Sequence, residues 1–248
     1  MKNSPLRDIF FPLRCCGCDK ITGSTLPFCE DCKRLVIKPD KTTGLCDVCG
    51  LHLSKCLCGK RLYYEKFSAV FYHENEARKN IFRLKFHLRR DIADSFAKAI
   101  LLQLDSRDIT EKTDVITFIP MCPFARLMRG YNQAELIAKR LSVHTGIPCA
   151  PLLTKEFSTK KQHELKGLAR SGNLLGVFEP HKEHTDEIAG KRILLVDDVS
   201  TTGNTLNEAA KTLLIFGAES VFTAVCTVRK KEKKLLNKNK RYAKMELS

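Results

Sequence analysis

Two adjacent carboxylates followed by small hydroxyl residues form the strongest chemical signal in this sequence. In ILLVDDVSTTGNT (193–205), a run of apolar residues leads directly into Asp197 and Asp198. The residues that follow as a polar loop are Ser200, Thr201, Thr202, Gly203, Asn204 and Thr205. Such a loop lets backbone N–H groups converge on an anion, and the positive end of a following helix adds to the attraction. The pattern predicts a phosphate site.

The acid pair restricts the ligand. Carboxylates beside a phosphate repel it unless another group lies between them. A ribose provides that group, because its 2′ and 3′ hydroxyls can donate to Asp197 and Asp198 while its 5′-phosphate lies in the loop. A Mg²⁺ ion on a neighbouring pyrophosphate would reduce the remaining repulsion. We therefore expect ribose 5-phosphate, with or without pyrophosphate at C1. A chance surface turn is the alternative, which the flanking buried strand and amphipathic helix disfavour.

Paired cysteines near the start of the chain predict a zinc module. A C-x-x-C pair bends the backbone so that two thiolates reach one tetrahedral ion, and two pairs complete the coordination. The first set is Cys15, Cys18, Cys29 and Cys32, and the second is Cys46, Cys49, Cys56 and Cys58. Disulfides are the competing account, but paired spacings in a reduced compartment favour zinc. Whether these cysteines bind one zinc ion or two, and whether the cysteine pairs of the two sets interleave, remains open.

The rest of the chain has the pattern of an α/β domain. Strand composition occurs at 67–72, 114–121, 193–198 and 220–228, and amphipathic helices are expected at 77–88, 92–104, 134–141 and 204–216. Strand–helix–strand units predict a parallel sheet with helices on both faces. The polar, basic segment 154–190 is expected to form a long loop or hood. We divide the chain into a zinc module (1–60), an α/β domain (61–228) and a basic tail (229–248).

The charge of the chain points to anionic partners. The formal net charge is +15, which favours nucleic acid or phosphorylated ligands, although it would also serve solubility alone. The tail has nine Lys or Arg residues against two Glu, and is either a solvated end or a basic arm for DNA or RNA. No segment has the length of a membrane span, and the first apolar stretch is too short for a signal peptide. We expect a cytoplasmic protein.

Several stretches resemble known families. VDDVSTTGNT (196–205) resembles the motif by which type I phosphoribosyltransferases bind 5-phosphoribosyl 1-pyrophosphate (PRPP). IPMCPFARLMRGYNQAELIA (119–138), LKGLARSGNL (165–174) and the cysteine array resemble the ComF family. This resemblance implies a zinc module ahead of a type I phosphoribosyltransferase-like domain. It also implies a role in DNA uptake during natural transformation, with single-stranded DNA and other DNA-uptake or recombination proteins as partners.

The resemblance also assigns roles to residues. Asp197 and Asp198 would hold the ribose hydroxyls, and the loop residues from Ser200 to Thr205 would hold the 5′-phosphate. The loop expected after the strand at 114–120 would face the pyrophosphate, with Arg129 and less closely Arg126 as the contacts. Asp197, Asp198 and Arg129 are thus the catalytic candidates. Lys85 matches a family position, although a solvated helix face explains it nearly as well.

One departure from the pattern argues against purine salvage. Purine phosphoribosyltransferases commonly carry an acid where this chain has Thr201, so no general base for a purine is evident.

Three functions remain open. The chain is an accessory protein that binds PRPP and single-stranded DNA, an active phosphoribosyltransferase with an unidentified acceptor, or a non-catalytic zinc-bearing adaptor with a relic sugar-phosphate site. Phe82, Phe86 and Tyr131 could stack on bases. Because Phe82 and Phe86 lie one helical turn apart, however, we expect these two rings to be part of the core.

Overall fold

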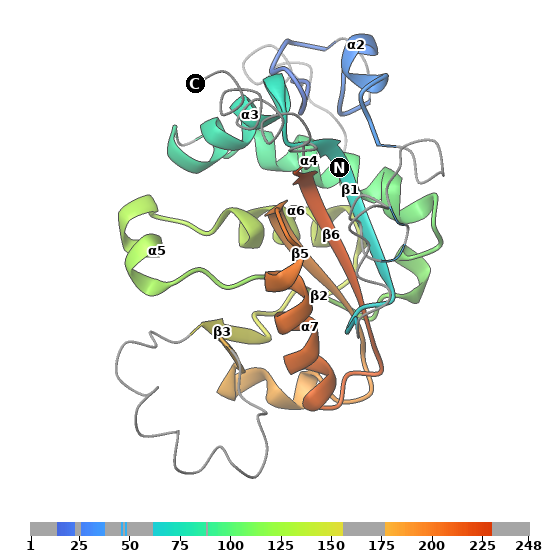
Figure 1. Ribbon diagram of the computed structural model, residues 1–248, viewed down its shortest axis with the longest axis vertical. Coiled ribbons are helices and arrows are strands. Elements are labelled where there is room, and N and C mark those ends of the chain that lie inside the picture. The colour runs from blue at the N-terminus through green and yellow to red at the C-terminus, as the bar shows by residue number, and fades with distance from the viewer. Residues whose placement is uncertain are drawn as a thin grey trace, which may run out of the picture.

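A four-stranded parallel sheet forms the centre of the molecule in the computed structural model (Figure 1), which describes residues 14–22, 26–37, 46, 48, 62–87, 89–155 and 177–229. The strands are β1 (Lys66–Tyr72), β2 (Val115–Phe118), β5 (Arg192–Ser200) and β6 (Ser220–Val228). Their order is β1-β6-β5-β2, and every neighbouring pair is parallel. The strands are rich in Val, Ile, Leu and Phe because both faces of a parallel sheet are buried.

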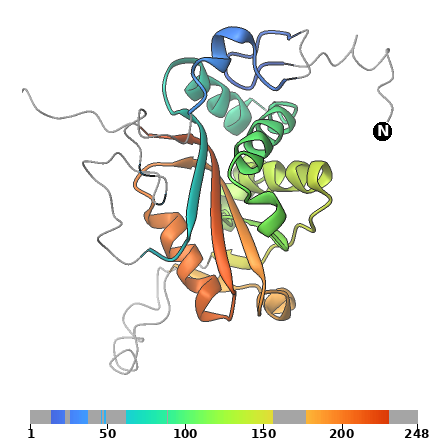
Figure 2. The same ribbon diagram turned by 90° about the vertical axis from the view of Figure 1, so that its right-hand side faces the viewer.

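Helices cover both faces of the sheet, as the sequence predicts. Figure 2 shows α7 on one side of the strands and α4 and α6 on the other. The helices of the α/β region are α3 (Asn75–Phe86), α4 (Ile92–Asp105), α5 (Pro123–Arg129), α6 (Gln133–Thr145) and α7 (Asn204–Ile215), with a short 3₁₀ turn, η3 (Thr110–Lys112). Two separate cores result, one between the sheet and α3, α4 and α6, the other beneath α7.

The structure differs from the sequence-based expectation in two segments. The stretch after β2 forms the short helix α5 instead of a loop, because Pro123 starts the helix and Gly130 ends it in the left-handed conformation with φ of 76°. The ends of the expected 154–190 hood pair as antiparallel strands β3 (Leu153–Lys155) and β4 (Phe178–Pro180), followed by η5 (Lys182–Glu187). The LKGLARSGNL patch lies outside the described residues.

The cysteine-rich start of the chain packs directly on the α/β domain. Cys16 and Phe28, which precede the short helix α2 (Glu30–Lys33), belong to the same buried cluster as the inner faces of α3 and α4. The Asn80 side chain of α3 donates to the carbonyls of Cys15 (3.3 Å) and Cys16 (3.0 Å). α3 is thereby fixed against the cysteine loop. Among the described helices, none has the length and apolar character needed to cross a membrane.

Candidate functional site

The two predicted acids lie at the carboxyl end of β5, near the end of the strand at Ser200. The side chain of Asp197 accepts a hydrogen bond from the backbone N–H of Asp198 (2.8 Å). The Asp198 carboxylate forms an ion pair with Lys85 of α3, with Nζ and Oδ2 2.7 Å apart. Both partners are largely buried, with side-chain exposures of 23% for Lys85 and 11% for Asp198. Lys85 is therefore a member of the site and not part of a solvated helix face.

Charge and burial at this edge of the sheet shift the titration of two groups. Burial, together with the neighbouring charge of Asp198, raises the pKa of Asp197 well above its usual value. Burial and the nearby Lys85 ammonium lower the pKa of His73, whose Nδ1 lies 2.9 Å from the Thr227 hydroxyl. A raised carboxyl pKa indicates that the surroundings do not fully compensate the ionised form of the carboxyl group, as is common at functional sites. No sequence motif pointed to His73.

The loop after β5 has the features of an anion site. Gly203 adopts φ of 77° and starts α7, which has neither a side-chain cap nor an acidic residue in its first turn. The first backbone N–H groups of such a helix have no partner within the helix. The Ser200 hydroxyl is buried and has no hydrogen-bond partner within the described part of the chain. The side chains of Thr201, Thr202, Asn204 and Thr205 are exposed at the mouth of this loop.

A segment from the other end of the domain supports this loop. The Tyr63 backbone N–H donates to Oδ1 of Asn207 in α7 (3.0 Å). A Cβ added at Gly203 would lie 3.6 Å from the Tyr64 hydroxyl, so this segment faces the glycine. These groups fit a ribose phosphate. The Ser200 hydroxyl and the first N–H groups of α7 are donors for the phosphate, and the carboxylates of Asp197 and Asp198 are acceptors for the ribose hydroxyls.

The predicted arginines lie on α5. Arg129 places its guanidinium 5.1 Å from the centre of the Phe86 ring, and so contacts the helix that carries Lys85. Arg126 instead forms an ion pair with Glu135 (3.2 Å). Arg129 makes no ion pair with Asp197 or Asp198 among the described residues. Arg129 of α5 therefore contacts α3, the helix that carries Lys85, whereas Arg126 forms an ion pair with a residue of α6.

The GYNQ stretch after Arg129 holds this corner together. Asn132 caps α6 by accepting from the Ala134 N–H (3.0 Å), and it donates to the Ile119 carbonyl at the end of β2 (2.9 Å). The Tyr131 hydroxyl donates to the Leu84 carbonyl of α3. Because these bonds join β2, α3 and α6, the motif has a structural role of its own.

The expectation that Phe82 and Phe86 are core residues is wrong. Each has 52% of its surface exposed, and their ring centroids lie 4.7 Å apart. The inner face of α3 is instead formed by Ile81 and Leu84. The i, i+4 spacing correctly places the two rings on one face, but that face points outward.

The first cysteine set forms a compact cluster that fits zinc. The sulfur atoms of Cys15, Cys18, Cys29 and Cys32 all lie within 4.8 Å of one another. Those of Cys18 and Cys29 are 3.7 Å apart, which matches the about 3.8 Å expected between two sulfurs in tetrahedral coordination with Zn–S bonds of about 2.3 Å. The Gly17 N–H donates to the Cys15 sulfur (3.3 Å). A Cβ at Gly17 would lie 2.7 Å from the Cys32 sulfur, so only glycine fits there.

The second cysteine set stays a prediction. Of its members, Cys49, Cys56 and Cys58 lie outside the described residues, and only Cys46 is described.

The parallel sheet and the acid pair ahead of the α7 loop define the class of protein. The fold is that of the type I phosphoribosyltransferases, and residues 124–246 match the family described as "Phosphoribosyl transferase domain". The chain is 31% identical over 205 residues to the DNA utilization protein YhgH of Escherichia coli (78% of this chain, 86% of that protein). It is 29% identical over 223 residues to Competence protein F of Haemophilus influenzae (86% and 95%). The chain belongs to the ComF family.

Among solved structures, the chain is similar to the B. subtilis glutamine PRPP amidotransferase complexed with ADP and GMP. The two share 18% sequence identity with a TM-score of 0.39, over 58% of this chain and 30% of the amidotransferase. The family assignment depends on the sequence relatives alone.

Proposed function

We propose that this protein binds PRPP with Mg²⁺ at the end of β5 and acts on single-stranded DNA during DNA uptake and use. One observation carries the first part: the acid pair faces an uncapped helix terminus beside a buried Ser200 hydroxyl that lacks a partner. Asp197 and Asp198 would accept the ribose hydroxyls, and the backbone from Ser200 to Thr205 would bind the 5′-phosphate. Mg²⁺ would neutralise charge on the pyrophosphate.

Lys85 and Arg129 support the pyrophosphate side of this site. Lys85 compensates Asp198 at 2.7 Å, which limits the repulsion between the acid pair and an incoming polyanion. Arg129 stands on the neighbouring helix above Phe86 and offers a planar set of donors suited to phosphate oxygens. The chain lacks the acid that purine enzymes carry at the Thr201 position. We therefore favour binding of PRPP over its transfer to a purine.

Titration calorimetry tests the sugar site directly. PRPP with Mg²⁺ is titrated into the zinc-loaded protein and into the Asp197→Asn/Asp198→Asn variant. We expect binding that the variant loses by a hundredfold or more, about 3 kcal/mol. The matched control is Glu111→Gln/Asp186→Asn, which removes two exposed carboxylates from 3₁₀ turns at the amino edge of the sheet. Absence of binding to the unaltered protein would refute the proposal. Pyrophosphate release in the presence of DNA would instead establish an active transferase.

The DNA part of the proposal is supported by the relatives' names and by the surface of α3. The exposed rings of Phe82 and Phe86 contact each other at a tilt of 45°, the Arg129 guanidinium lies over the Phe86 ring, and the chain has a net charge of +15. Single-stranded nucleic acids bind to surfaces where aromatic rings stack on bases and cations contact phosphates. We place the bases on these two rings, next to the sugar-phosphate site.

Fluorescence anisotropy with a labelled oligo-dT tests this surface. Since stacking contributes about 1–3 kcal/mol per base, Phe82→Ala/Phe86→Ala should weaken binding by at least about tenfold. The salt dependence should be unchanged, because no phosphate contact is removed. Leu127→Ala/Met128→Ala is the control, as both side chains are exposed and apolar but not aromatic. Equal affinity of the phenylalanine variant and the unaltered protein would exclude this surface.

A further inference from the structure

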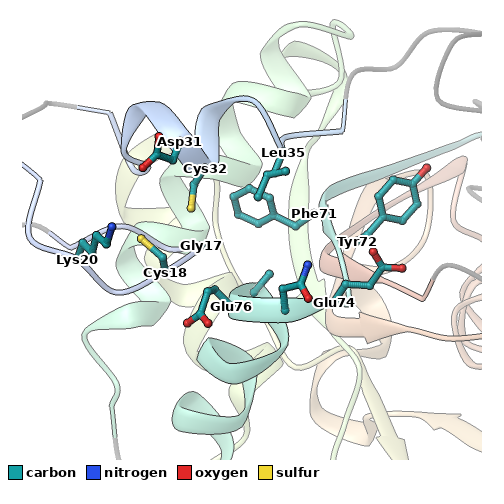
Figure 3. A pocket seen from close by; sticks show the side chains of 12 residues that line it. Gly17, Cys18, Lys20, Asp31, Cys32, Leu35, Phe71, Tyr72, Glu74 and Glu76 are labelled. Atoms are coloured by element: carbon teal, nitrogen blue, oxygen red, sulfur yellow. The ribbon is translucent and has the colours of Figure 1, made fainter.

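A cavity lies between the cysteine loop and the start of α3. Its volume is about 490 Å³, and Figure 3 shows the side chains that line it. The apolar part is formed by Phe71, Leu35 and Ala77, and Leu35 has 61% of its surface exposed. A concave apolar surface of this size accommodates one or two aliphatic side chains together with the chain that carries them.

The rim of this cavity is acidic. Three carboxylates, those of Asp31, Glu74 and Glu76, stand against the single ammonium of Lys20. Glu76 is paired with Lys79 (2.5 Å). Asp31 and Glu74, however, have neither an ion pair nor a side-chain hydrogen bond within the described residues. In a chain of net charge +15, the cavity is thus a local acidic site with an apolar floor. Its ligand should combine aliphatic and cationic groups.

The last described strand, β6, ends beside this cavity. Tyr72, which lines the cavity, pairs in register with Val228, the last residue of β6. The His73 N–H donates to the Val228 carbonyl (2.8 Å), and the Arg229 N–H donates to the Ser200 carbonyl (2.9 Å). The residues from 230 to 248 lie outside the described part of the chain, and they start from this position.

The sequence of that segment has the composition that the cavity requires. KKLLNK (233–238) places Leu235 and Leu236 between lysines on both sides. Leu236 lies seven positions after Arg229, which gives a reach of about 23 Å at about 3.3 Å per residue. We propose that the cavity binds the chain's own 230–248 tail, with Leu235 and Leu236 on Phe71 and Leu35 and the flanking lysines on Asp31 and Glu74.

This docking would control the availability of the tail's basic groups. Lysines held on Asp31 and Glu74 do not contact phosphates, so DNA and the cavity compete for the same segment. Because the tail is attached next to the cavity, its effective concentration is of the order of millimolar, and even weak contacts suffice to hold it. Docking of the tail depends neither on PRPP nor on Phe82 and Phe86, whereas its competition with DNA rests on the function proposed above.

Limited trypsin digestion of the full-length, zinc-loaded protein tests the proposal, with cleavage after the tail lysines followed by mass spectrometry. We expect the tail to be cut about tenfold more slowly than in Asp31→Lys/Glu74→Lys. Leu235→Ser/Leu236→Ser should release the tail equally, and it leaves the folded domain unchanged. Glu111→Lys/Asp186→Lys makes the same charge change at the amino edge of the sheet and should leave the rate unaltered.

Three outcomes would overturn the proposal. The first is a tail that is cut equally fast in the unaltered protein and in both test variants. The second is faster cleavage of the tail in Leu235→Ser/Leu236→Ser but not in Asp31→Lys/Glu74→Lys, which would show that the tail binds at another place. The third is a protection that disappears on dilution, which would show that the tail of a second copy occupies the cavity.

Discussion

Replacing Gly17 by alanine should disrupt the cysteine cluster without changing any sulfur ligand. The added Cβ would lie 2.7 Å from the Cys32 sulfur and 3.0 Å from its Cβ. Ordinary contact begins near 3.4 Å, so Cys32 must move by about 0.7 Å (3.4 minus 2.7). Metal–ligand distances tolerate shifts of about 0.2 Å. The new methyl group would also be in contact with the Phe71 ring, at 3.4 Å.

The expected effect is large for the metal and moderate for stability. Displacement of one ligand by more than the coordination tolerates should weaken zinc binding by about 10–100-fold, comparable to the loss of a residue that orients a ligand. Overpacking at this buried position should lower the free energy of unfolding by about 1–3 kcal/mol. Competition with a chromogenic chelator measures the first quantity, and urea unfolding of the zinc-loaded protein measures the second.

Gly130→Ala separates this steric effect from a general effect of removing a glycine. Gly130 has φ of 76° and no heavy atom within 4 Å of the added Cβ, so only backbone strain of about 1–2 kcal/mol is expected there. Zinc affinity should be unchanged in this control. If Gly17→Ala retains zinc as tightly as Gly130→Ala does, the cluster does not hold the metal in the geometry described here.

Three further predictions concern the sugar site and its support. Asp197→Asn should stabilise the protein by about 1–2 kcal/mol near neutral pH. Because the folded pKa of Asp197 is raised, ionisation of its carboxyl group destabilises the fold as pH rises through that pKa. The stabilisation by Asp197→Asn should therefore be smaller in acid than at neutral pH. An equal stabilisation in urea unfolding at acidic and at neutral pH would contradict this. Gly203→Ala should cost about 1–2 kcal/mol and lose PRPP binding in calorimetry, whereas Gly146→Ala, with nearly the same φ and open space, should retain it. Asn80→Ala removes the side-chain donor of the Cys16 carbonyl, whereas the Cys15 carbonyl keeps the Asp19 N–H, and it should cost about 1–3 kcal/mol in thermal unfolding; a smaller loss would show that water replaces the amide.

The periodicity of the sequence was enough to predict the sheet and its flanking helices. β6 covers 220–228 as expected, because a run of nine residues in which six are apolar, placed between turn signals, admits few alternatives. The position of the polar loop after β5 was also predictable, since its glycine and hydroxyl residues follow directly on a buried strand. In both cases the signal lies within a short stretch of chain.

Contacts between distant stretches could not be read from such local signals. The Lys85–Asp198 pair joins residues 113 positions apart (198 minus 85), and helical periodicity describes only which residues share a face with Lys85. The same limit explains the error at Phe82 and Phe86: their spacing defines a stripe, but the position of the neighbouring helices decides whether that stripe is covered. α5 was missed because it buries none of its residues, so it has no apolar pattern.

Helix α3 connects all the features that the proposed function requires. Within twelve residues it holds the cysteine loop through Asn80, presents Phe82 and Phe86 to solvent and pairs Lys85 with Asp198. These contacts are all made by one helix, so a displacement of the cysteine loop is expected to shift the helix that compensates the acid pair. We therefore expect the cysteine cluster and the candidate sugar-phosphate site to be coupled through α3, although no residue belongs to both. Such coupling would give the N-terminal cysteines a role in the α/β domain beyond folding their own segment.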